Sequence, residues 1–174
     1  MTFKVGQIMA YPSMTAVTVA NIQPDEIHIE DICCSLSHMP RFAGHTPVLQ
    51  TVAEHSVLVW YVVREAGGTW DEQRWALAHD FSEAYIMDMP KPIKDLPEMA
   101  PYRAMEDRIH SAIAERFNLS PEIPDIVHKA DAERGRIDLQ SGRFSNRAWS
   151  SIDAFDYLWS AIGELQFQRY PYLR

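Results

Sequence analysis

Two imidazoles and two carboxylates stand at positions where a solvated side chain is not expected, and they are His55, His79, Asp80 and Asp131. His55 lies within the apolar side of a predicted helix, and Asp131 follows Val127 by four residues on a stripe that should face a core. A carboxylate that faces a core is costly unless it is paired or binds a metal. These four residues are therefore the first candidates for chemistry.

Each of them, taken alone, has a structural explanation. A lone helical histidine such as His55 is usually a hydrogen-bonded core residue, and Asp131 could pair with Lys129 or Arg134. The combination is more informative, because two imidazoles and two carboxylates on nearby helices form a mixed nitrogen and oxygen ligand set. Such a set suits Zn, Mn, Fe or Co, does not exclude Mg, and leaves positions for water and substrate. The sequence therefore predicts a divalent metal site, whereas His110 is expected on the surface of its helix.

The elements that must position these side chains are predicted to be mostly helical. Two short β-type runs, Gln7–Tyr11 and Thr15–Ala20, flank Pro12-Ser13 and predict a small hairpin. Beyond them, apolar residues recur at helical spacing, and capping boxes begin at Thr51 and at Thr69. The predicted helices are Ile29–Ser37, the segment from Thr51 to a stop at Gly67-Gly68, Thr69 through Tyr85 with His79-Asp80 in its middle, Tyr102–Phe117, Pro124–Leu139 and Ser151–Tyr170, with a proline-enforced loop at Pro90, Pro92, Pro97 and Pro101.

Length and composition indicate one globular domain. The chain has 174 residues, of which 47% are hydrophobic and 23% are charged, and a chain of this size can bury a proper core. We therefore expect a single domain over 1–174, all-α with a small N-terminal β-hairpin or extended segment in 1–28. The aromatic residues near the C-terminus could belong to the core or to a dimer face, so a homo-oligomer is left open; they are Trp149, Trp159, Phe167, Tyr170 and Tyr172.

Net charge and cysteine content argue against several classes of protein. The formal net charge of −8 argues against nucleic-acid and anionic-membrane binding, which need a basic field. The adjacent Cys33 and Cys34 cannot form an ordinary disulfide with each other, and no signal segment or membrane span is seen, so a reduced cytoplasmic protein is expected. The Gly-rich nucleotide-binding motifs are missing as well.

Four segments together resemble the HD-domain phosphohydrolases, and they are Arg41–Thr46, Thr51–Val59, Ala78–Tyr85 and Asp88–Lys94. The resemblance extends from about Ile29 to Arg134. The chain is most similar to the small bacterial 5′-deoxynucleotidases and to phage-encoded HD hydrolases, which include deoxyadenosine triphosphate (dATP) triphosphohydrolases. The resemblance implies the all-α HD-domain fold, in agreement with the helical prediction, and metal-dependent hydrolysis of a deoxynucleotide phosphate.

The resemblance also implies a role for each candidate. The metal ligands would be His55, His79, Asp80 and Asp131. The acidic residue that the family carries three positions after the His-Asp pair falls on Glu83, and its later aspartate falls on Asp88. The phosphate-binding arginine corresponds to Arg41, and the adjacent aromatic residue, which abuts the deoxyribose in the deoxynucleotidases, corresponds to Phe42.

Physical reasoning gives these residues their chemistry. Glu83 follows Asp80 by three residues and His79 by four, so on a continuous helix it would share their face and could act as general acid or base, with Asp88 sharing that role. Cations of the motif segments would bind phosphate, and they are Arg41, His45, Lys91 and Lys94, with Lys129 and Arg134 in reserve. Solvated loop charge is the alternative for Lys91 and Lys94.

The number of cations bears on the substrate. A monophosphate on a divalent metal needs one or two of them, whereas a triphosphate could use all, so a deoxynucleoside monophosphate 5′-nucleotidase and a deoxynucleoside triphosphate triphosphohydrolase, for example one acting on dATP, both stay open. An alarmone or cyclic-nucleotide phosphodiesterase is the alternative enzyme, although alarmone hydrolases carry two acidic residues here and Ala84 follows Glu83. A non-catalytic nucleotide-binding domain should have lost a ligand, and none is missing.

Overall fold

The computed structural model describes residues 4–140 and 149–167, without the side chains of 139 and 140. Its long helices are α1 (Ile29–His38), α2 (Val52–Glu65), α3 (Trp70–Ala78), α6 (Ala100–Phe117), α7 (Asp125–Gln140) and α8 (Ser151–Glu164). The short elements are strands β1 (Gln7–Met9) and β2 (Ala16–Thr18), helices α4 (Glu83–Ile86) and α5 (Lys91–Lys94), and 3₁₀ turns η1 (Val19–Asn21), η2 (Pro24–Glu26), η3 (Arg41–Gly44) and η4 (Pro97–Met99). The prediction of an all-α fold with a small hairpin is confirmed.

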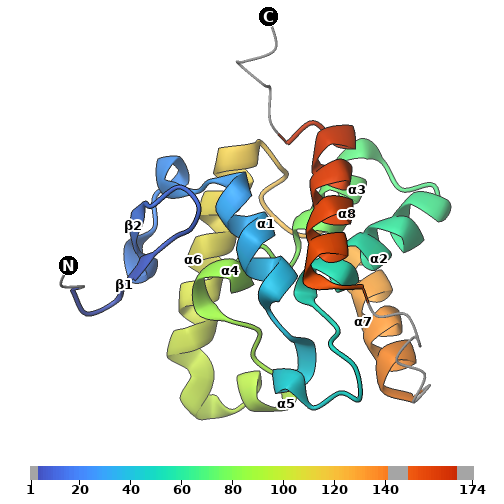
Figure 1. Cartoon of the computed structure of the whole chain (residues 1–174), viewed down its shortest axis with the longest axis horizontal. Coiled ribbons are helices and arrows are strands. Elements are labelled where there is room, and N and C mark those ends of the chain that lie inside the picture. The colour runs from blue at the N-terminus through green and yellow to red at the C-terminus, as the bar shows by residue number, and fades with distance from the viewer. Residues whose placement is uncertain (1–3, 141–148, 168–174) are drawn as a thin grey trace, which may run out of the picture.

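Helix α2 is the centre of the helical body. It contacts α1, α3, α7 and α8, and Val52, Val59 and Val63 on it are fully buried. Val62, next to Val63 in the sequence, is 41% exposed. Figure 1 shows the hairpin on one side of this body and α7 on the other. Among residues 4–140 and 149–167, no helix has the length and apolar composition that a membrane crossing requires.

The hairpin is antiparallel and is tied to the helices by a buried carboxylate. Ile8 pairs with Val17, whose side chain is fully buried, and the 3₁₀ turns that follow β2 contact α6. Asp31 on α1 accepts hydrogen bonds from the backbone N–H of Ser13 (2.7 Å) and from its hydroxyl (2.6 Å). The turn of the hairpin is therefore fixed to the helix that contacts both α2 and α8.

Both predicted helix starts are found, with one difference. Thr69 and Glu72 form a reciprocal capping box at the start of α3. At the start of α2 the Thr51 hydroxyl accepts from the Glu54 N–H (3.1 Å), but the Glu54 carboxylate instead accepts from the backbone N–H of Trp149 (3.3 Å). Glu54 therefore links α2 to the segment that leads into α8 rather than completing a capping box.

Ionisation of Glu54 should lower the free energy of unfolding as pH rises. Burial raises the pKa of Glu54 to about 6, and the charge of Asp138 raises it further. Since the unfolded chain has a pKa near ~4.3 at this residue, the native state holds the proton more tightly. The free energy of unfolding should therefore drop by up to about 2 kcal/mol between pH 4 and 7, and Glu54→Gln should lack this drop. Urea unfolding of both proteins in chelator at the two pH values measures it; equal pH slopes would contradict it.

Two helix ends differ from the prediction. The helix that was expected to run through Tyr85 ends at Ala78, and the next hydrogen bonds join residues three apart, from Phe81 N–H to the Ala78 carbonyl (2.9 Å) and from Glu83 N–H to the Asp80 carbonyl (3.0 Å). His79-Asp80 thus stands at a helix end rather than in the middle of a helix. Helix α8 ends at Glu164 instead of Tyr170, and its Ile152 is 72% exposed.

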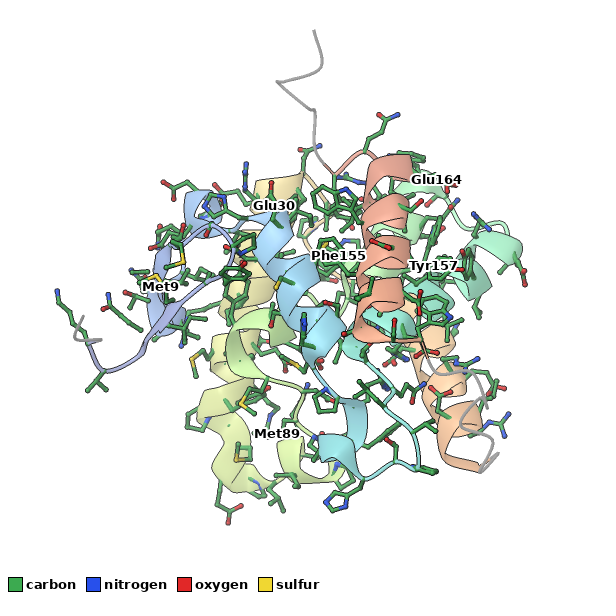
Figure 2. The ribbon with its side chains drawn as sticks, viewed as in Figure 1. Met9, Glu30, Met89, Phe155, Tyr157 and Glu164 are labelled. Carbon is green, nitrogen blue, oxygen red and sulfur yellow. The ribbon has the colours of Figure 1, made fainter. Side chains whose placement is uncertain are left out.

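The aromatic residues near the C-terminus divide between core and surface. Phe167 is buried, with its ring centroid 5.6 Å from that of Phe81. Phe155 and Tyr157 extend from different sides of α8 (Figure 2), where Phe155 stacks on Trp159 and Tyr157 stacks on Trp149. Tyr170 and Tyr172 lie outside the described residues.

Candidate metal centre

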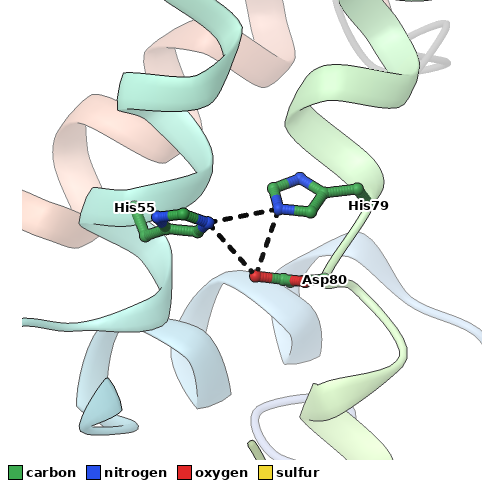
Figure 3. A group of neighbouring side chains, drawn as sticks. All are labelled: His55, His79 and Asp80. Atoms are coloured by element: carbon green, nitrogen blue, oxygen red, sulfur yellow. Dashed lines mark hydrogen bonds and ion pairs between the residues drawn. The ribbon is translucent and has the colours of Figure 1, made fainter. Parts of the chain in front are cut away.

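The two candidate histidines meet the candidate aspartate of the helix end. The Nε2 atoms of His55 and His79 lie 3.3 Å apart. Asp80 Oδ2 lies 3.2 Å from His79 Nε2 and 3.8 Å from His55 Nε2, so the three side chains form a triangle (Figure 3). This group could hold a metal ion. The expected ligand set of two imidazoles and a neighbouring carboxylate is therefore brought together in space.

Asp131 of α7 approaches the same histidines from another side. Its Oδ1 lies 3.0 Å from His55 Nε2 and 3.9 Å from His79 Nε2. Its side chain is 43% exposed, so it borders solvent rather than facing the core as the apolar stripe suggested. The expectation of a costly buried carboxylate is wrong for Asp131, but the expectation that it lies near the histidines is confirmed.

The separations fit coordination of a divalent transition metal. Metal–nitrogen and metal–oxygen bonds of about 2.0–2.2 Å place neighbouring ligand atoms about 3.0–3.6 Å apart and opposite ones about 4.2 Å apart. The ligand atoms of His55, His79 and Asp80 lie 3.2 to 3.8 Å from one another, and Asp131 Oδ1 lies 3.0 and 3.9 Å from the two histidine Nε2 atoms. His55, His79 and Asp80 could therefore share one ion, with Asp131 beside both histidines.

The protonation of the histidines is set by burial and by the carboxylates. Burial lowers the pKa of His55 to about 4, and the charge of Arg41 also lowers it, so the ring is neutral at pH 7 as a metal ligand must be. Burial alone would lower the pKa of His79 too, but the charge of Asp80 raises it above its usual value. Its Nδ1 lies 2.8 Å from the Ala76 carbonyl oxygen, which turns Nε2 toward the group.

Arg41 adds a guanidinium to the edge of this group. Its Nη1 lies 3.5 Å from Asp80 Oδ2, and its side chain is only 12% exposed. Arg41 begins η3, where Phe42 and Ala43 both have positive φ (55° and 52°), a conformation that non-glycine residues rarely adopt and that is commonest at functional sites. The Phe42 ring lies beside the guanidinium, with the Arg41 Cζ 5.1 Å from its centroid.

Two further carboxyl groups, those of Glu83 and Asp88, interact electrostatically with Asp80 of the metal-binding group. Glu83 is buried, its Oε2 has no hydrogen-bond partner in the described part of the chain, and burial together with the charge of Asp80 raises its pKa well above its usual value. Asp88 Oδ2 accepts from the Phe42 N–H (3.3 Å), and burial raises its pKa. The helix breaks between Asp80 and Glu83, so the argument from a continuous helical face was wrong, although the charge of Asp80 still acts on Glu83.

Comparison with curated proteins finds YfdR of Escherichia coli strain K12, an uncharacterized protein. The two sequences are 38% identical over 128 residues, which make up 71% of this chain and 68% of YfdR. The chain belongs to the YfdR family. No family model matches the sequence.

Only part of the predicted phosphate-binding set lies at the centre in this YfdR family member. Lys94 is largely buried, with its Nζ 2.7 Å from Glu106 Oε1. Burial alone would lower the pKa of its ammonium, but Glu106 and the charge of Glu83 raise this pKa above its usual value. Lys91 is 83% exposed and pairs with Asp95, so it is solvated loop charge. His45 and Lys129 are exposed, and Arg134 pairs with Asp138 (2.6 Å). Arg41 and Lys94 are therefore the predicted cations that the structure links to the group.

Sequence reasoning missed two residues beside the histidines. His110 was predicted as a surface residue, but its Nε2 lies 2.9 Å from the Ser82 hydroxyl and 3.1 Å from the His79 carbonyl oxygen. Asp138 is buried, with its Oδ2 4.0 Å from His55 Nδ1. A signal for Asp138 exists in the sequence, because it follows Asp131 by seven residues and thus lies on the same face of α7.

Proposed function

We propose that this YfdR family member is a metal-dependent phosphohydrolase of the HD-domain type that cleaves the 5′-phosphate ester of deoxynucleotides. The observation that carries the proposal is the Arg41 guanidinium 3.5 Å from Asp80, beside two histidines whose Nε2 atoms lie 3.3 Å apart. A cation fixed at the edge of a metal-binding group is what a phosphate needs, since one of its oxygens can bind the ion while another accepts from the guanidinium.

The ligand set is His55, His79, Asp80 and Asp131, and Zn, Mn, Fe or Co suits it best. A metal ion bound there supplies positive charge for a phosphate oxygen and a bound water of lowered pKa. Arg41 neutralises and orients the phosphate. The Phe42 ring beside Arg41 packs against the C2′ side of the sugar, where a 2′-hydroxyl would be buried without a partner.

Two carboxyl groups act as general acid and general base in the proposed reaction. Glu83, whose pKa is raised well above its usual value by burial and by the charge of Asp80, donates its proton to the 5′ oxygen as the bond from phosphorus to that oxygen breaks. Asp88, just beyond the end of α4, accepts the proton of the attacking water. The products are a deoxynucleoside with a 5′-hydroxyl and the released phosphate.

Product analysis on a nucleotide panel tests the proposal. Purified protein supplemented in turn with Zn²⁺, Mn²⁺ and Co²⁺ should release deoxynucleoside from deoxynucleoside mono- or triphosphates, with ribonucleotides cleaved about tenfold to a hundredfold more slowly. Phosphorus NMR distinguishes tripolyphosphate from orthophosphate and so separates a triphosphohydrolase from a 5′-nucleotidase. Turnover confined to cyclic nucleotides or alarmones, or binding without turnover, would reject the proposal.

Lys94 should matter to phosphate binding, whereas Lys91 should not. Lys94→Ala removes a largely buried ammonium within reach of the charge of Glu83, and the loss of a charge-assisted hydrogen bond should lower kcat/KM by about 10–100-fold. Lys91→Ala is the matched control, because this ammonium is exposed and pairs only locally with Asp95. Steady-state kinetics on the best substrate of the panel measures both variants. Equal effects of the two substitutions would remove Lys94 from the site.

A further inference from the structure

The buried ring of His55 has one nitrogen facing the metal-binding group and one facing α7. Nε2 lies 3.0 Å from Asp131 Oδ1, whereas Nδ1 has no hydrogen-bond partner in the described part of the chain. The Oδ2 of Asp138, also without a partner there, lies 4.0 Å from this Nδ1. Both side chains are almost completely buried, with 0% and 4% exposed. A ring nitrogen and a carboxylate oxygen therefore face each other away from water.

The other candidate ligand shows what His55 lacks. His79 Nδ1 lies 2.8 Å from the Ala76 carbonyl oxygen, so the backbone fixes the orientation of that ring. No backbone acceptor plays this part for His55 among the described residues. A histidine that binds a metal through Nε2 must carry its proton on Nδ1, and this N–H is almost always given to a carboxylate, a carbonyl or water.

The tautomer of His55 must therefore depend on what occupies Nε2. Without a ligand on Nε2, this nitrogen carries the ring proton and donates it to Asp131 Oδ1, 3.0 Å away. With Nε2 as a metal ligand, the proton moves to Nδ1 and needs an acceptor in a fully buried place. Asp138 Oδ2 is the carboxylate oxygen on that side, 4.0 Å from Nδ1, and it accepts Nδ1–H once this separation shortens to hydrogen-bonding distance.

We propose that Asp138 is the positioning residue of His55, accepting Nδ1–H and holding Nε2 toward the metal. The inference rests on the metal site of the proposed function but not on its substrate. Arg134 pairs with the other oxygen of this carboxylate, since its Nη2 lies 2.6 Å from Asp138 Oδ1, and this leaves Oδ2 for His55. The two oxygens of one carboxylate thus serve two partners.

Three variants separate this role from a purely structural ion pair. Asp138→Leu removes the acceptor, Asp138→Asn keeps an acceptor oxygen of the same reach, and Arg134→Gln breaks the ion pair while leaving the carboxylate beside His55. Zn²⁺ affinity, measured in the full chain by competition with a chromophoric chelator, should fall about 10–100-fold in Asp138→Leu. Asp138→Asn should recover most of this loss, and Arg134→Gln should stay within about threefold of the unchanged protein.

A spectroscopic measurement decides the mechanism independently of affinity. In the Zn²⁺-loaded protein, the His55 Nδ1 proton should appear in imidazole-selective ¹H–¹⁵N spectra and exchange slowly with water. This proton should be lost to rapid exchange in Asp138→Leu and retained in Arg134→Gln. Equal Zn²⁺ affinity of Asp138→Leu and Arg134→Gln, or an unchanged Nδ1 proton in Asp138→Leu, would overturn the inference. A lack of nucleotide hydrolysis with these results intact would instead reject only the proposed substrate.

Discussion

Glu83→Gln should lower kcat by about 10²–10⁴ while leaving the bound metal in place. Glu83 is buried beside Asp80 and Asp88, and the charges of both, added to its burial, raise its pKa well above the usual value for a glutamate. A raised pKa favours the protonated carboxyl group, which can give its proton to a leaving oxygen. Glutamine has almost the same shape but cannot donate a proton in that way, so the substitution removes proton transfer without opening a cavity in the site.

Single-turnover and steady-state rates, together with metal content by elemental analysis, check this expectation. Glu98→Gln on η4 is the control, because it removes an exposed carboxylate of the same stretch of chain. A fall in kcat without a change of KM or of metal content supports the role of proton donor. Loss of metal in Glu83→Gln would make Glu83 a ligand instead, and an unchanged kcat would remove it from the proton transfer.

Helix positions could be predicted from the sequence because capping and periodicity act locally. Thr51, Thr69 and the Gly67-Gly68 stop delimit α2 and α3 through hydrogen bonds that involve neighbouring residues alone. The end of α3 at Ala78 could not be found in this way. Phe81 is fully buried, and its ring centroid lies 5.6 Å from that of Phe167 near the end of the described chain. Contacts between such distant segments are not visible in a local pattern.

His55 and His79-Asp80 could be predicted as candidate ligands because they stand in or beside apolar helical patterns, whereas Asp131, singled out for a core-facing position, is 43% exposed. The sequence could not show which of the candidate cations form ion pairs outside the site. Arg134 was counted among the phosphate-binding cations, but it is held by Asp138, and Lys91 is held by Asp95. His110 was missed because its neighbours on α6 do not reveal that the His79 carbonyl oxygen lies within hydrogen-bonding distance of it.

Removing the metal should abolish activity without unfolding the protein. Purified protein should carry or require about one transition-metal ion per chain, since the ligand atoms of His55, His79 and Asp80 lie close enough together to share one ion and Asp131 lies beside them. Dialysis against a strong chelator should reduce hydrolysis to background, and readdition of Zn²⁺, Mn²⁺ or Co²⁺ should restore it. Elemental analysis and the nucleotide assay follow both steps. Full activity after exhaustive chelation would reject the metal mechanism.

Substitution of the candidate ligands should also abolish activity, and it should do so without unfolding the protein. Asp80→Asn keeps the shape of the side chain but removes the charge that lies 3.2 Å from His79 and 3.5 Å from Arg41, so both metal and phosphate binding should be lost. His79→Ala removes a ligand nitrogen directly. Asp95→Asn is the control, because Asp95 pairs only with the exposed Lys91. Both site variants should keep the far-ultraviolet circular dichroism of the unchanged protein, since the end of α3 and the turn that carries these residues are packed through the buried Trp75, Leu77 and Phe81. Retention of a full equivalent of metal by Asp80→Asn would mean that the ion binds elsewhere in the chain.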